Sequence, residues 1–453
     1  MTADERNQLF ETLPVRQAVR RQIVPAIISQ MIALIYNLAD TYFVGMRNSP
    51  TETAAVTVAY SSFVMLTAIS NLFGVGGASA IARALGRRET GRARELAAVS
   101  FWFGLASAAL FSLLFALLAR PILYLAGATD ATYAATIGYA RWTIVIGGPF
   151  TILNVLLANL VRAEGRAARA SFGVSLGGVL NILLDPLLIL PRFADLGAAG
   201  AGIATAASNA AAALFLLLSI LSRRGDTALS LRLKDLRHTR AHLRGILAVG
   251  FPSALQYALT VVAIAAQAKF VSRYPTEAVA ALGIVKKLDQ LPLYFSIGVS
   301  SGLLPLLAYT DSAGDRARRR AAFRYGCAVS FGFSMLCLIL FEAFAAPLAS
   351  IFIGDPTTIA YAASFLRRMV TAMPLMSLAY PMIIQFQAMG RVRESLICSV
   401  LRKGVLDIPL LFLMDAVAPL YGLMWVQPIV DGVSLAAALW FLLRIQREEI
   451  PEK

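Results

Sequence analysis

Long apolar runs separated by short polar stretches fill most of the chain, and their lengths match helices that span a bilayer. A span needs about 20 apolar residues, because the hydrocarbon core of a bilayer is about 30 Å thick. Helices also satisfy their own backbone hydrogen bonds, which the bilayer interior requires. The pattern predicts an all-α polytopic membrane protein with twelve spans, at about residues 19–45, 54–82, 96–119, 134–161, 170–191, 198–221, 246–271, 279–307, 322–346, 359–387, 395–415 and 420–443.

The composition supports the same class. Hydrophobic residues make up 58% of the 453 residues and charged residues 15%, against roughly 45–50% and about 25% in an ordinary soluble chain. The lipid bilayer is therefore the expected partner. The expected location is the cell membrane (plasma or inner membrane), with multiple spans.

The formal net charge of +15 is distributed unevenly along the chain. Lys and Arg gather in both tails and in the loops that follow every second span. The alternate loops hold only Arg47, Arg120, Arg192 and Arg273. By the positive-inside rule the basic side is cytoplasmic, so we expect both termini there. The basic excess is then a topology signal, and no nucleic-acid partner is expected.

The second half of the chain repeats the first at offsets of 224–227 residues. Pro25-Ala26-Ile27 matches Pro252-Ser253-Ala254, and Pro50-Thr51-Glu52 matches Pro275-Thr276-Glu277. Six spans per unit give the two halves the same orientation. The predicted domains are an N-terminal six-helix lobe (1–222), a cytoplasmic linker (223–245) and a C-terminal six-helix lobe (246–453). Transporters built this way hold their site between the lobes.

Asp40 is the only acid in the otherwise nearly uncharged run from Ile23 to Val44. A carboxylate at the centre of a spanning helix costs about 2.5–3.5 kcal/mol on insertion scales, so it usually faces a cavity or a partner. Asn37 lies three residues earlier and can share its helix face. At the repeat offset of 227 the counterpart of Asp40 is Gln267, so the acid belongs to one lobe only.

A second polar group lies in the fifth predicted span. Asn181 and Asp185 are four residues apart and therefore share a helix face, and Pro186 bends the helix next to them. This arrangement favours a polar pocket in the N-terminal lobe. A hydrogen-bond clamp between helices is the structural alternative.

Other charges inside the spans favour structural roles. Arg402 and Lys403 are interpreted as residues that snorkel to the membrane surface or set topology, with Asp407 as a neutralising partner of Lys403. The remaining members of this group are Lys286, Lys287, Asp289, Glu342 and Asp431.

Several other kinds of chemistry find little support. Cys327, Cys337 and Cys398 are scattered without metal-ligand spacing, and the two histidines, His238 and His242, fall in the polar linker. The spans therefore contain no histidine for a catalytic triad. We expect neither an enzyme nor a metal site, and no cofactor.

Three motifs together resemble the multidrug and toxic compound extrusion (MATE) family. They are Asn37-Leu38-Ala39-Asp40-Thr41-Tyr42-Phe43-Val44-Gly45 in the first span, Phe73-Gly74-Val75-Gly76-Gly77-Ala78-Ser79 at the end of the second, and Arg162-Ala163-Glu164-Gly165 followed by Asn181 to Pro186. Their order and spacing run over nearly the whole chain. The run Ala308-Tyr309-Thr310-Asp311-Ser312 departs from the family pattern.

The resemblance implies a V-shaped molecule of two pseudo-symmetric bundles that exports organic, often cationic and drug-like, compounds in exchange for protons or sodium. Asp40, Asn181 and Asp185 match residues of the N-terminal lobe implicated in cation coupling in the DinF-like branch. Asn37 joins this candidate cation-coupling or substrate site because of its spacing from Asp40, and Tyr36, Gln256 and Gln267 are expected to line the cavity. The tenth span lacks the acid on which the NorM-like branch relies, which favours proton coupling. Sodium coupling, or flipping of lipids or lipid-linked sugars, remains an alternative. We expect a monomer.

Overall fold

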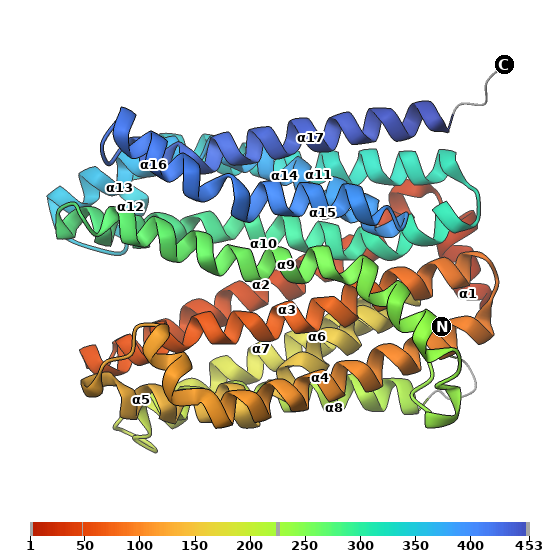
Figure 1. Ribbon diagram of the computed structural model, residues 1–453, viewed down its shortest axis with the longest axis horizontal. Helices are drawn as coiled ribbons and strands as arrows, with labels where there is room; N and C mark the ends of the chain where they lie inside the picture. The colour runs from red at the N-terminus through yellow and green to blue at the C-terminus, as the bar shows by residue number, and fades with distance from the viewer. Residues whose placement is uncertain (1–2, 48, 223–226, 450–453) are drawn as a thin grey trace.

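The computed structural model describes residues 3–47, 49–222 and 227–449, and almost all of them are helical (Figure 1). Each predicted span has a helical counterpart, and the all-α fold is confirmed. The first half contains α1 (Ala3–Asn7), the π-helix η1 (Gln8–Thr12), α2 (Val15–Gly45), α3 (Pro50–Gly86), α4 (Thr90–Leu125), α5 (Asp130–Ala140), η2 (Arg141–Ile146), α6 (Gly148–Ala163), α7 (Ala167–Ile189) and α8 (Gly197–Leu221).

The second half repeats this order. It contains η3 (Leu233–Asp235), α9 (Thr239–Val271), α10 (Thr276–Ser312), α11 (Arg316–Ala343), α12 (Ala345–Ser350), α13 (Pro356–Met369), α14 (Ala372–Ala388), α15 (Val392–Val400), η4 (Leu401–Val405), α16 (Asp407–Val417), η5 (Gly422–Met424) and α17 (Val426–Glu448).

Several of the predicted spans are not straight helices. Within the described residues, nine helices are long and apolar enough to cross a membrane, and two bent pairs raise this number to eleven. The bends are 46° between 130–146 and 148–163, and 45° between 356–369 and 372–388. The remaining span breaks between α15 and α16 at Lys403 and Gly404, whose backbone leaves the helical region.

Helices α2–α8 form an N-terminal lobe and helices α9–α17 a C-terminal lobe. Figure 1 shows the two lobes as layers that diverge toward the end carrying α5 and α13. The lobes meet where α3 packs on α9 and where α2 and α3 pack on α10. The lobe boundaries taken from the sequence stay a prediction, and Arg223, Arg224 and Gly225 of the linker lie outside the described residues.

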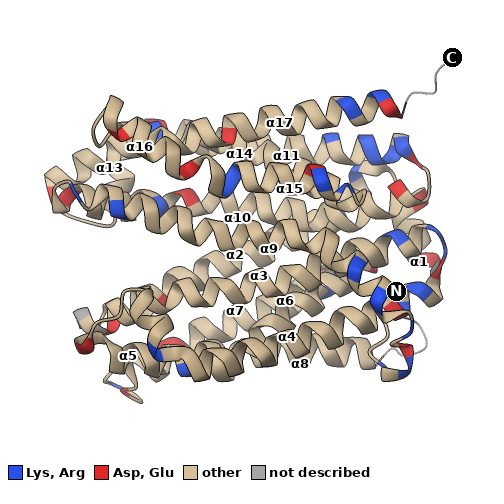
Figure 2. Ribbon diagram, viewed as in Figure 1, with Lys and Arg blue, Asp and Glu red and all other residues tan. Residues whose placement is uncertain are grey.

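The loops rich in Lys and Arg collect at one end of the molecule, together with both ends of the described chain (Figure 2). We call this the basic end, defined by the loops that follow α3, α6, α8, α10 and α14, and the opposite end the far end. The contacts between the lobes concentrate toward the basic end. Ser79 Oγ donates to the carbonyl oxygen of Gln387 at 2.7 Å, and a Cβ added to Gly302 would lie 2.7 Å from the carbonyl oxygen of Gln22.

The basic end is also tied by the segments outside the spans. Glu11, in η1, forms an ion pair with Arg88 at 3.0 Å and accepts a hydrogen bond from the Tyr309 hydroxyl at 2.6 Å, so it joins the two lobes. The described part of the linker is not a loose tether. Buried Glu164 accepts hydrogen bonds from the backbone N–H of Ala228 at 2.6 Å and from the Thr227 hydroxyl.

Candidate functional site

The acid site of the N-terminal lobe forms where α2 and α7 run side by side. Gly178 permits this close approach, because a Cβ there would lie 2.6 Å from Ile32 Cγ2 and 3.2 Å from Tyr36 Cδ1. The approach brings Asp40 of α2 and Asp185 of α7 within electrostatic reach of each other. The two acids noted separately in the sequence therefore belong to one site.

Asn181 completes this site from the same face of α7. Its Nδ2 donates to Asp185 Oδ1 at 3.3 Å, and both side chains are buried, at 2% and 0% exposure. Asp40 is half-buried.

Three oxygen atoms of the acid site lack a hydrogen-bond partner among the described residues: Asp40 Oδ1, Asn181 Oδ1 and Asp185 Oδ2. A buried acceptor without a partner costs about 1–3 kcal/mol, and more when it is charged. Two carboxylates held together repel each other unless a proton or a cation lies between them. Oxygen atoms are the ligands that hard cations prefer. The geometry therefore suits a proton or a small hard cation such as sodium.

Two tyrosines lie beside the acid site, and one of them, Tyr139, goes beyond the sequence prediction. Tyr36 was expected to line the cavity, and it lies within electrostatic reach of both Asp40 and Asp185. Tyr139 of α5 also lies within electrostatic reach of both acids, and it is 6% exposed. Nothing in the sequence distinguishes Tyr139 from other tyrosines, since only the fold brings α5 to this place.

Asn37 lies beside the acid site and also contacts the other lobe. Its Nδ2 donates to the carbonyl oxygen of Ala33 at 2.7 Å and to the hydroxyl of Tyr294, on α10, at 3.4 Å. The amide thus reaches the C-terminal lobe, whereas Asp40 faces α7. The structure places Asn37 at the border between the lobes beside the acid site.

The two glutamines expected to line the cavity lie in α9 and are both buried, at 7% exposure. Gln267 donates to the carbonyl oxygen of Leu423 at 3.3 Å. Among the described residues, no hydrogen bond links Gln256 or Gln267 to Asp40 or Asp185. The glutamines therefore belong to the C-terminal lobe and not to the acid site.

The C-terminal lobe holds a buried charge cluster that the sequence interpretation missed. Arg402 is not a snorkelling residue: it is 2% exposed, and its Nε lies 3.0 Å from Asp431 Oδ1. Its guanidinium also lies over the Tyr380 ring, 4.1 Å from the centroid. Gln427 donates to Asp431 at 2.7 Å and accepts from Lys403 at 2.6 Å. The charges of η4 thus point into the lobe, because the break in the helix turns them inward.

A pocket adjoins this cluster. Its polar lining residues are Gln267, Lys286, Lys403, Asp407 and Gln427. They come from α9, α10, η4, α16 and α17, so five separate elements meet here. Residues this far apart in the chain can be recognised as one site only when the fold is known.

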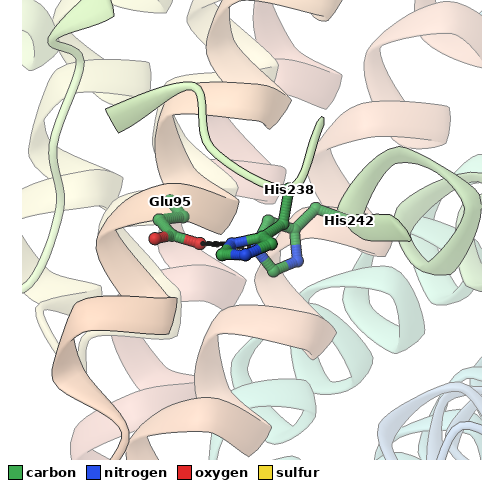
Figure 3. Close-up of side chains that lie close together, drawn as sticks. All are labelled: Glu95, His238 and His242. Atoms are coloured by element: carbon green, nitrogen blue, oxygen red, sulfur yellow. Dashed lines mark hydrogen bonds and ion pairs between the residues drawn. The ribbon is translucent and has the colours of Figure 1, made fainter. Parts of the chain in front are cut away.

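His238, His242 and Glu95 form a third polar group, at the basic end (Figure 3). His242 Nε2 lies 2.8 Å and His238 Nδ1 3.2 Å from the same carboxylate oxygen, Glu95 Oε2. Imidazole and carboxylate are ligands that zinc accepts. Both rings contact this oxygen directly, so the group links α4 to the start of α9.

Comparison with known proteins places this architecture in a family. A model described as MatE matches residues 25–187 and 252–413, which together exceed half of the chain. The chain belongs to the MatE family. The resemblance noted in the sequence motifs is confirmed, and the two matched segments fall one in each lobe of this MatE protein.

Individual relatives agree with the family model. The chain is 29% identical over 443 residues to the multidrug export protein MepA of Staphylococcus saprophyticus, covering 97% of both chains. It is 28% identical over 444 residues to MepA of Staphylococcus aureus, again covering 97% of both. A solved outward-facing structure of a multidrug resistance MATE transporter matches with a TM-score of 0.90 and 25% identity, covering 97% of this chain and 98% of the other.

Proposed function

We propose that this MatE protein is a secondary active multidrug exporter, which moves organic and often cationic compounds out of the cell against an inward flux of protons. The observation that carries the proposal is the pair of acids, Asp40 and Asp185, with buried oxygens that lack partners among the described residues. Two relatives are multidrug export proteins, which supports the substrate class.

The sidedness of the molecule supports export. The positive-inside rule assigns the basic end, with both termini, to the cytoplasm. Asp40 lies five residues before the end of α2 at Gly45, which is about 8 Å along the helix axis from the far end. The lobes are in contact on the cytoplasmic side and diverge on the other (Figure 1). We infer an outward-facing state in which a proton can reach the acid site from outside.

The coupling then follows from charge. With both carboxylates ionised, the acid site attracts a cationic substrate. A proton from outside neutralises Asp40, weakens the repulsion from Asp185 and removes the attraction for the substrate, which leaves. After the lobes rearrange, the proton is lost to the cytoplasm. The membrane potential supplies about 2.3 kcal/mol per elementary charge per 100 mV, a useful driving force for export.

Sodium is the second candidate for the coupling ion, because the three oxygens that lack partners in the described part of the chain also suit a hard cation. The resemblance to the DinF-like branch favours the proton. We treat the exporter as a monomer, since a single chain contains both lobes and the whole acid site.

Efflux of a fluorescent cationic dye from cells that express the protein tests the proposed function. We expect efflux that stops when a proton uncoupler is added and that continues in sodium-free buffer. Efflux that resists the uncoupler but needs sodium would assign the coupling to sodium. An accumulation of dye identical to that of cells without the protein would contradict the exporter itself.

A further inference from the structure

The only two histidines of the chain meet one carboxylate at the basic end. His238 and His242 are four residues apart at the start of α9. Both rings reach the same oxygen atom of Glu95, which lies in the second turn of α4 (Figure 3). Two histidines at this spacing are a common way for a helix to present two nitrogen ligands to one zinc ion.

The donor atoms are close to the spacing that a metal ion requires. One ligand atom from each of the three residues lies within 4.8 Å of the others. A tetrahedral zinc ion with bonds of about 2.0–2.2 Å holds its ligands about 3.4 Å apart, so side-chain shifts of about 1 Å complete the site. The side chain of His242 is 8% exposed, whereas that of His238 is 75% exposed and has room for this adjustment. The exposed side leaves the fourth position of the ion to water.

The carboxylate of Glu95 is available to a cation. In the part of the chain that the structure describes, Glu95 forms ion pairs with the two histidines alone. Arg92, on the same helix, pairs with Glu89 instead. Imidazole and carboxylate together suit zinc and its neighbours among the transition metals, whereas calcium and magnesium prefer sets of oxygen ligands. The ligand set therefore selects a divalent transition-metal ion.

The three side chains also connect the two lobes, because α4 belongs to the N-terminal lobe and α9 to the C-terminal lobe. The linker before α9 is held by α4, since Trp102 Nε1 donates to the carbonyl oxygen of Leu231 at 3.0 Å. His238 and His242 lie where the chain turns from this linker into α9. An ion bound here ties α9 to α4 at the end of the molecule where the lobes touch.

We propose that Glu95, His238 and His242 form a binding site for a divalent transition-metal ion of the zinc type at the cytoplasmic face. The proposal departs from the sequence expectation that the chain has no metal site. Two histidines in a polar linker do not indicate such a site by themselves. The third ligand lies 143 residues before His238 in the chain, and only the fold brings it to the histidines.

The bound ion would slow transport, a consequence that rests on the proposed export function. In the outward-facing state the lobes touch at the basic end, and an exporter must open that end to take up substrate from the cytoplasm. Opening moves α9 away from α4, so the bonds between the ion and one of the two helices must break. Zinc at the cytoplasmic face would thus hold the exporter in the outward-facing state.

Zinc binding to the purified full-length protein tests the site itself. The protein carries a purification tag without histidine, and competition with a chromophoric zinc chelator in detergent measures the affinity. We expect one zinc ion per wild-type chain. Loss of a hydrogen bond that supports a metal ligand costs about 10–100-fold in affinity. Loss of a ligand itself, in His238→Gln or Glu95→Gln, should cost at least as much.

Two variants separate metal binding from a polar contact alone. The amide of His238→Gln can still donate a hydrogen bond to Glu95, so the contact survives while the zinc ligand is lost. Glu89→Gln is the matched control, because it removes a carboxylate that pairs with Arg92 and leaves the site intact. Zinc should raise the Tm of the wild type and of Glu89→Gln but not that of His238→Gln. A wild-type protein that binds no zinc, or His238→Gln with wild-type zinc affinity, would overturn the proposal.

Dye transport in inverted membrane vesicles tests the consequence, because the basic end then faces the added buffer. Under a proton gradient we expect zinc to slow the wild-type protein, a chelator to restore its rate, and His238→Gln to ignore the zinc. Equal slowing of both proteins, or zinc bound without any slowing, would contradict the inferred link between the lobes. A wild-type protein that moves no dye with or without zinc, yet binds zinc at this site, would contradict the exporter and not the site.

Discussion

Gly250→Ala is expected to open the contact between α3 and α9 and to favour the state that faces the basic end. A Cβ at Gly250 would lie 2.7 Å from the carbonyl carbon of Leu72 and 3.0 Å from its Cα, and closer still to its carbonyl oxygen. Ordinary contacts begin at 3.4 Å, so the two backbones must separate by more than the roughly 0.7 Å that the carbonyl carbon alone requires. Neither partner is a flexible side chain that could turn away.

The cost can be estimated from overpacking. An extra methyl group in a tightly packed contact destabilises it by about 1–3 kcal/mol. Because α3 belongs to one lobe and α9 to the other, that cost falls on the state in which the lobes touch here. A shift of this size changes the ratio of two conformations by about 5- to 150-fold.

Gly245→Ala provides a matched control in the same helix, since a Cβ there meets no atom within 4 Å. Spin labels at Arg87 and Arg393, exposed positions at the basic end of the two lobes, report the separation by pulsed electron resonance in a background without the native cysteines. We expect a longer distance in Gly250→Ala and the parental distance in Gly245→Ala. Identical distance distributions for both variants would refute the claim that the contact between α3 and α9 holds the lobes together.

Two further predictions concern stability and the linker. Arg402→Met removes the ion-pair partner of the buried Asp431 carboxylate, which keeps only the hydrogen bond from Gln427. We expect the free energy of unfolding to fall by about 3–5 kcal/mol, seen as a lower Tm in detergent. The double variant Arg402→Met/Asp431→Leu should recover most of the lost stability. No recovery would argue against the broken ion pair as the cause of the loss. Glu164→Gln weakens the bonds to Thr227 and Ala228, so amide exchange in residues 227–238 should speed up while α9 stays protected. Unchanged exchange there would mean that other contacts hold the linker.

The sequence predicted the twelve spans because the bilayer imposes a simple local requirement, a run of apolar residues of a given length. The duplication and the two acids of the N-terminal lobe were also visible, since Asp40 and Asp185 stand out against apolar surroundings. The break at Gly404 was not predicted. A glycine beside a lysine in a spanning segment fits both an intact helix and a broken one, and the choice depends on Asp407 and on helices that follow later in the chain.

The burial of Arg402 was missed for a related reason. A basic residue in a span most often reaches for the membrane surface, and only the fold shows that Asp431, Gln427 and Tyr380 surround it. Likewise, the sequence places both histidines in the polar linker, and only the fold shows that His242 is 8% exposed and contacts Glu95. Local patterns identify spans and isolated charges, whereas the pairing of distant charges requires the three-dimensional arrangement.

The central claim is that Asp40 carries the coupled proton. Its most direct test is proton movement in sodium-free proteoliposomes with an imposed pH gradient, followed by an internal pH-sensitive dye after a cationic substrate is added. The account predicts substrate-driven proton movement in the wild type and its loss in Asp40→Asn, with substrate binding still measurable on the purified variant. Full proton antiport by Asp40→Asn would contradict the account.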